Sequence, residues 1–146
     1  MTIDDTSVLQ EGAGSEGPWI GVDFDGTLAT YEGWRAQGEA LGEPIPAMVA
    51  RVRYWLAEGR YAIKIMTARA SRSAPKRERD IGLIQRWCAR HIGIIPDVVA
   101  EKDFAMVALY DDRAVAVDPN TGRAFGYSVY DTLDPLTFDD EVRLCI

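Results

Sequence analysis

Short apolar runs alternate with helical patterns along the chain, and this alternation restricts the fold more than any other feature. Two longer segments, Pro44–Glu58 and Pro75–His91, carry apolar residues at helical spacing. Strands that alternate with helices favour a parallel sheet wrapped by helices. We therefore predict an α/β fold with a central, mainly parallel sheet. The candidate strands that would form it are Trp19–Phe24, Tyr61–Met66, Asp97–Ala100 and Met106–Tyr110.

The remaining segments complete the predicted organisation. Ala114–Val117 and Ala124–Tyr127 flank the stretch Asp118-Pro-Asn-Thr-Gly122, a pattern typical of a β-hairpin. Residues 1–18 carry four acids and no base, together with several Gly and Pro, so we expect a flexible tail there. Residues 19–146 are expected to form a single domain, because that length suffices for a full hydrophobic core.

The polar residues of chemical interest follow the candidate strands. Ligands of parallel α/β sheets gather at the carboxyl ends of the strands, which share one edge of the sheet. We therefore expect these residues to converge, although they are distant in sequence. They are Asp23 and Asp25 after the first strand, Thr67 after the second, Lys102 after the third, and Asp111 and Asp112 after the fourth.

Asp23 and Asp25 stand two positions apart at the end of an apolar run, where their like charges repel. Burying carboxylates is costly unless a cation or a shared proton compensates. Magnesium takes oxygen ligands, usually one or two protein carboxylates together with water and substrate phosphate. Asp23, Asp111 and Asp112 suit such a site, and Lys102 could balance the charge of a phosphate. An aspartate so placed can attack phosphorus, and a second carboxylate can protonate the leaving group.

Four motifs occur in order between residues 19 and 117: DFDGTLAT, MTARAS, EKDF and LYDDRA. Together they resemble the four motifs of the haloacid dehalogenase (HAD) superfamily of phosphohydrolases. The resemblance implies a three-layer Rossmann-like fold around the parallel sheet. It also implies a magnesium-dependent phosphatase that hydrolyses a phosphate monoester through an aspartyl-phosphate intermediate.

The resemblance assigns the acidic residues individual roles. Asp23 matches the nucleophile and a magnesium ligand. Asp25 matches the general acid/base, with its main-chain carbonyl on magnesium. Phosphatases of the superfamily keep an acid at this position, whereas the dehalogenases do not. Asp111 and Asp112 match the acidic pair of the fourth motif, of which at least one binds the metal.

Three further residues are candidates for phosphate binding. Thr67 matches the phosphate-binding hydroxyl of the second motif, and the backbone N–H groups near it can hold phosphate oxygens. Lys102 matches the basic residue of the third motif, which steadies the phosphate and the nucleophile. Arg69 follows the second motif closely, and it could contact substrate or pair with an acid.

Many relatives in this superfamily carry a cap domain, but the chain leaves no room for one. The insertion points would be residues 26–43 and 101–106, whereas independent folding needs about 40 residues or more. We therefore expect a core without a cap and an open site. Such a site suits a large substrate, or closure by another subunit, and it still admits a small ester. A nucleotide, a sugar phosphate and a phosphorylated polynucleotide end all stay open as substrates.

The segment 69–90 is basic in an otherwise acidic chain. It holds seven basic residues against Glu78 and Asp80, while the net charge of the chain is −7. A solvated helix face would explain this pattern. An electrostatic attraction for a phosphorylated substrate is the alternative explanation.

Composition and charge restrict the partners and the compartment. The acidic net charge argues against a general nucleic-acid binder, so we consider nucleic acid only as a phosphorylated substrate. No apolar run approaches the roughly 18 residues of a membrane span. The two cysteines, Cys88 and Cys145, lie far apart, which favours a reduced, cytoplasmic protein. Nothing in the sequence indicates the oligomeric state.

Two alternatives come from another functional class. Receiver domains of signalling proteins also combine aspartates, magnesium, a threonine and a lysine on a parallel sheet. They place the acid pair first and the phosphoacceptor on a later strand, whereas here the acid pair comes last. A non-catalytic HAD-like binding module is the second alternative, and the retention of every catalytic residue type argues against it.

Overall fold

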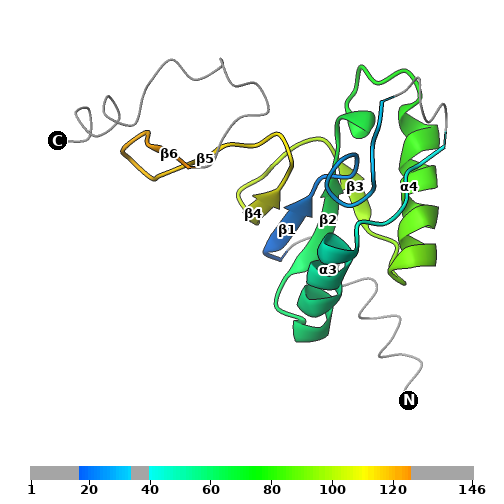
Figure 1. The fold of residues 1–146 in the computed structure, drawn as a ribbon, viewed down its shortest axis with the longest axis horizontal. Helices are drawn as coiled ribbons and strands as arrows, with labels where there is room; N and C mark the ends of the chain where they lie inside the picture. Colours follow the sequence, from blue (N-terminus) through cyan, green and yellow to red (C-terminus); the bar gives the residue numbers. More distant parts are fainter. Residues whose placement is uncertain (1–16, 34–39, 126–146) are drawn as a thin grey trace. The chain divides into compact units, whose positions relative to one another are not determined.

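The computed structural model describes residues 17–33 and 40–125, and Figure 1 shows their helices and strands. The chain divides into two compact units, Met1–Asp111 and Asp112–Ile146. Most of the expected N-terminal tail, the acidic C-terminal segment and Cys145 lie outside the described residues.

The first unit contains a four-stranded sheet in the order β3-β2-β1-β4, and every neighbouring pair of strands is parallel. This confirms the predicted α/β arrangement with a parallel sheet. The strands are β1 (Trp19–Val22), β2 (Ala62–Met66), β3 (Asp97–Val99) and β4 (Met106–Tyr110). The helices are α3 (Pro46–Glu58) and α4 (Arg77–His91), with a short 3₁₀ turn, η1 (Ala68–Ala70), between β2 and α4.

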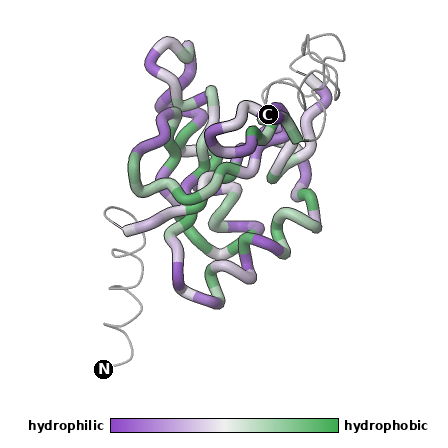
Figure 2. The backbone as a smooth tube through the Cα atoms, turned by 90° about the vertical axis from the view of Figure 1, so that its left-hand side faces the viewer, coloured by the Kyte–Doolittle hydropathy of each residue, from purple (hydrophilic) through white to green (hydrophobic). Residues whose placement is uncertain are grey.

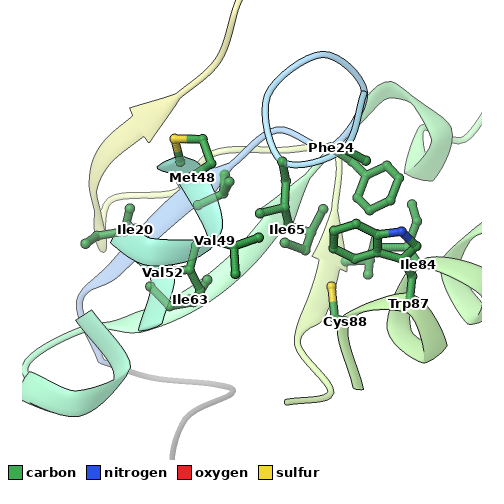
Figure 3. Packing of buried hydrophobic residues seen from close by; sticks show 14 of the residues in the cluster. Ile20, Phe24, Met48, Val49, Val52, Ile63, Ile65, Ile84, Trp87 and Cys88 are labelled. Atoms are coloured by element: carbon green, nitrogen blue, oxygen red, sulfur yellow. The ribbon is translucent and has the colours of Figure 1, made fainter. Parts of the chain in front are cut away.

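One face of the sheet carries the hydrophobic core. Side chains alternate between the faces of a strand, and the register places Ile20 beside Ile63 and Val22 beside Ile65. Both helices pack on this face, as Figure 3 shows, and each buried aliphatic side chain contributes about 1.5–3 kcal/mol. From α3 and α4 the buried contributors are Met48, Val49, Val52, Ile84, Trp87 and Cys88.

The chain order explains why both helices share that face. The path from β1 to β2 to β3 moves in one direction across the sheet, and right-handed crossovers then place each connecting helix on the same side. Along the tube in Figure 2, hydrophobic segments alternate with hydrophilic ones, as such half-buried elements require.

The three-layer part of the prediction is not tested on the opposite face of the sheet. Both described helices pack on the first face, and no helix covers the opposite one among residues 17–33 and 40–125. The connection from β3 to β4 is short, and residues 100–105 pass β2 and β1 to reach the far edge. Trp19 holds this connection: its Nε1 donates to Asp103 over 2.8 Å and its backbone N–H to the Ala105 carbonyl over 3.0 Å. The short connection leaves no space for a cap domain at this point.

The second unit contains the predicted hairpin. β5 (Ala116–Val117) pairs antiparallel with β6 (Ala124–Phe125), and the Asp118 N–H donates to the Arg123 carbonyl over 2.8 Å. Asn120 and Gly122 adopt φ values of 66° and 78°, which turn residues such as Asn and Gly tolerate. The hairpin is therefore confirmed; β5 is shorter than the sequence pattern indicated, and residues 126–127 of the second predicted strand lie outside the described residues.

Candidate active site

The turn after β1 fixes the two leading aspartates. Phe24 lies between Asp23 and Asp25 and is 0% exposed, so the core holds the backbone of the pair in place. The Phe24 carbonyl accepts the N–H groups of Leu28 and Ala29, each over 3.0 Å, which closes a tight loop. Gly26 makes this loop possible through its φ of 86°, a conformation that other residues rarely adopt.

Asp23 belongs to a cluster of three carboxylates. Its backbone N–H donates to the Tyr110 carbonyl over 2.9 Å, which ties the end of β1 to the end of β4. Asp111 and Asp112 follow β4 directly, and carboxylate oxygens of the three aspartates lie within 4.8 Å of one another. The Thr27 hydroxyl donates to Asp23 Oδ2 over 3.4 Å. Three convergent carboxylate oxygens fit a hard divalent cation such as magnesium.

Arg69 holds Asp25 by two hydrogen bonds. Arg69 Nε donates to Asp25 Oδ2 over 2.6 Å, and Nη2 donates to Oδ1 over 2.9 Å. This fork is the strong, bidentate form of an arginine–carboxylate pair. Of the two roles considered for Arg69, the structure therefore contains the pairing with an acid.

A second aspartate, Asp80, approaches Arg69 from α4. Arg69 Nη1 lies 3.6 Å from Asp80 Oδ2, and both side chains are at most 7% exposed. Burial disfavours the charged guanidinium, but the hydrogen bond and charge of Asp25, with the charge of Asp80, outweigh it and raise the pKa of Arg69. Arg69 is thus a fully charged group between two carboxylates.

Asp80 is the site residue that the sequence interpretation missed. It is 5% exposed, and its Oδ1 atom is buried without a hydrogen-bond partner in the described structure. The helical pattern contained the signal, because Asp80 lies four residues before the buried Ile84 and eight before Cys88. A carboxylate on the buried stripe of a helix needs a cation nearby.

Thr67 lies at the end of β2, where it begins η1. Its backbone N–H donates to the Val99 carbonyl over 2.8 Å, and its Oγ1 accepts the Arg69 N–H over 3.2 Å. The side chain is buried, so its orientation is fixed by these contacts. The hydroxyl proton remains available to an oxygen acceptor, because Oγ1 acts as an acceptor towards Arg69.

Lys102 lies in the exposed connection that follows β3. Within the part of the chain that the structure describes, no hydrogen bond or ion pair joins it to Asp23, so its role stays a prediction. The neighbouring Asp103 turns towards the sheet instead. The hydrogen bond from Trp19, with that from the Ala105 backbone, lowers the pKa of the Asp103 carboxyl.

In comparisons with known proteins, no family model, curated protein or solved structure matches the chain. None of the described helices is long and apolar enough to span a bilayer. The residues of the site are therefore the only indication of function within the described structure.

Proposed function

We propose that the protein is a magnesium-dependent phosphatase that hydrolyses a phosphate monoester, as a HAD-like enzyme without a cap domain. The observation that carries the proposal is the convergence of Asp23, Asp111 and Asp112 within 4.8 Å, beside a sheet whose parallel strands end together. Aspartates in this arrangement suit magnesium, which neutralises charge on the transferred phosphoryl group. Of the other candidate residues, Asp25 follows β1, Thr67 and Arg69 follow β2, and Lys102 follows β3.

The proposed reaction divides the work between two aspartates. An oxygen of Asp23 attacks phosphorus, so a new P–O bond forms to the enzyme while the bond to the leaving oxygen breaks. Asp25 gives its proton to the leaving oxygen. Asp25 then accepts a proton from water, which attacks phosphorus and releases Asp23 and inorganic phosphate. Thr67 and Lys102 support the phosphate oxygens.

The Arg69–Asp25 pair adds a condition to this scheme. Because both of its oxygens accept hydrogen bonds from Arg69, the Asp25 carboxylate is engaged by the guanidinium and not by a leaving group. A bound phosphate is the natural competitor, because a phosphate dianion takes the same guanidinium fork as a carboxylate. We infer that substrate phosphate displaces Asp25 from Arg69 and so releases the general acid.

The same ion pair favours one alternative function. A carboxylate held permanently by Arg69 would suit a binding module that accepts phosphate without turnover. Such a module would bind phosphate in a magnesium-dependent manner and would release none from an ester.

A hydrolysis assay tests the proposal. The purified protein should release phosphate from an aryl phosphate in the presence of magnesium, and a chelator should abolish this release. Asp23→Asn should abolish activity, and Asp25→Asn should reduce it by about 10²-fold or more. Asp97→Asn is the matched control, because Asp97 is exposed and begins β3 at the opposite end of the strand. Activity that survives Asp23→Asn would contradict the proposed mechanism.

A further inference from the structure

The loop between η1 and α4, with the first turn of α4, forms an exposed basic surface. We define the basic loop as residues 71–79, which hold Arg72, Lys76, Arg77 and Arg79 against the single acid Glu78. All four basic residues are exposed. An open pocket of about 550 Å³ lies here, lined by residues 74–79. Figure 2 shows this loop as a hydrophilic stretch at the top of the molecule.

Two contacts tie the basic loop to the candidate site. Arg77 Nε donates to the Ala70 carbonyl over 2.8 Å, which joins the first residue of α4 to the last residue of η1. Asp80, directly after the loop, lies 3.6 Å from Arg69. Arg69 in turn holds Asp25. The pocket is therefore next to the residues that would receive the scissile phosphate.

The charges of the basic loop favour an anion beside them. Exposed bases that are close together repel one another, and bases in the first turn of a helix also oppose its dipole. The rest of the chain is acidic, since the net charge is −7. A concentrated positive surface beside an acidic site attracts an anionic substrate that the remaining surface would repel.

We propose that the basic loop binds backbone phosphates of the substrate, and that the substrate is a single-stranded oligonucleotide with a terminal phosphate. This inference rests on the proposed phosphatase function. Small-molecule sites are enclosed, whereas this pocket is open and four of its six lining residues are charged. Charged grooves that follow a repeating backbone are typical of single-strand binding. A phosphopeptide would bring one phosphate, which one arginine could bind.

Competition between substrates tests the inference. We would measure kcat/KM at increasing salt for two substrates: a terminally phosphorylated oligonucleotide of about ten nucleotides, and p-nitrophenyl phosphate. The quantity of interest is the ratio of the oligonucleotide value to the p-nitrophenyl phosphate value. The double variant Arg72→Glu/Lys76→Glu should lower this ratio about tenfold, and it should flatten its salt dependence. The matched control is Arg60→Glu, because Arg60 is exposed and precedes the amino end of β2.

A binding measurement separates this inference from the proposed function. Fluorescence anisotropy of a labelled, phosphorylated oligonucleotide with Asp23→Asn protein requires no turnover. Salt-sensitive binding that the double variant loses supports the inference even if no ester is hydrolysed. Hydrolysis of aryl phosphate without preference for the oligonucleotide, and without salt-sensitive binding, would overturn the inference and leave the phosphatase proposal intact. Equal or better binding of a phosphopeptide would overturn it as well.

Discussion

The buried pair of Arg69 and Asp80 gives the sharpest stability prediction. Removing one partner of a buried ion pair costs about 3–5 kcal/mol, because the other charge stays in the interior uncompensated. Asp80 is 5% exposed, and in Arg69→Met the charge of Arg79 remains near it. Arg79 Nη2 lies 3.6 Å from Asp80 Oδ1, but the Arg79 side chain is 38% exposed. We therefore expect Arg69→Met to lower the free energy of unfolding by about 3–5 kcal/mol.

Asp80→Asn should cost much less. Arg69 keeps its two short hydrogen bonds to Asp25, at 2.6 and 2.9 Å, so its charge remains compensated. The substitution also removes a charged oxygen that has no hydrogen-bond partner in the described structure. A cost of about 1 kcal/mol follows, because what is lost is the 3.6 Å charge contact between Arg69 and Asp80. In the double variant Arg69→Met/Asp80→Asn, a neutral amide replaces the Asp80 carboxylate and no longer needs a cation. The loss of stability in the double variant should therefore be smaller than the sum of the two single losses by about 1–3 kcal/mol.

Urea unfolding, followed by tryptophan fluorescence in buffer with chelator, measures all three variants without reference to activity. Equal m-values would show that the compactness of the unfolded state is unchanged. Arg53→Met is the control, because exposed Arg53 donates to the His91 carbonyl and should cost less than about 1 kcal/mol. A cost below about 1 kcal/mol for Arg69→Met, or full additivity in the double variant, would refute the reasoning.

Three further predictions concern stability and metal binding. Burial raises the pKa of the Cys88 thiol from 9.0 to about 12. The contribution of this thiol to the free energy of unfolding should therefore be fully present below pH 9 and be lost as the pH rises towards 12. Cys88→Ala should remove this contribution to the decrease of the denaturation midpoint with pH. Gly26→Ala should cost about 1–2 kcal/mol in the same urea assay, because φ is positive there. Magnesium should raise the thermal midpoint of the native protein, and Asp111→Asn should abolish the increase, whereas Asp97→Asn should retain it.

The sequence predicted the parallel sheet because local patterns determine it. Apolar runs such as Trp19–Val22 and the helical stripe of α3 report burial directly, and chain order then restricts the topology. The third layer was predicted from resemblance alone, and no helix supplies it within the described residues. The convergence of Asp23 with Asp111 was also foreseeable, since parallel strands end at one edge.

The partners of Arg69 were not foreseeable in the same way. Asp25 and Arg69 are separated by 44 residues. Only the folded chain brings η1, which carries the guanidinium of Arg69, close to the turn after β1. Asp80 lies on the buried stripe of α4, but a helical pattern places a residue on a face without identifying what packs opposite it. Side-chain pairing between elements depends on packing that no spacing rule encodes.

The ion pair changes how the two leading aspartates must be understood. Asp23 and Asp25 repel each other as charges, and each has a different source of compensation: a cation held by the carboxylate cluster would compensate Asp23, whereas Arg69 pairs with Asp25. In the proposed reaction, a substrate phosphate would take the guanidinium fork and free Asp25 to act on the leaving group. Asp80 would then keep the charge of Arg69 balanced while Asp25 is released. The buried acid on α4 would therefore support the arginine during the proposed exchange.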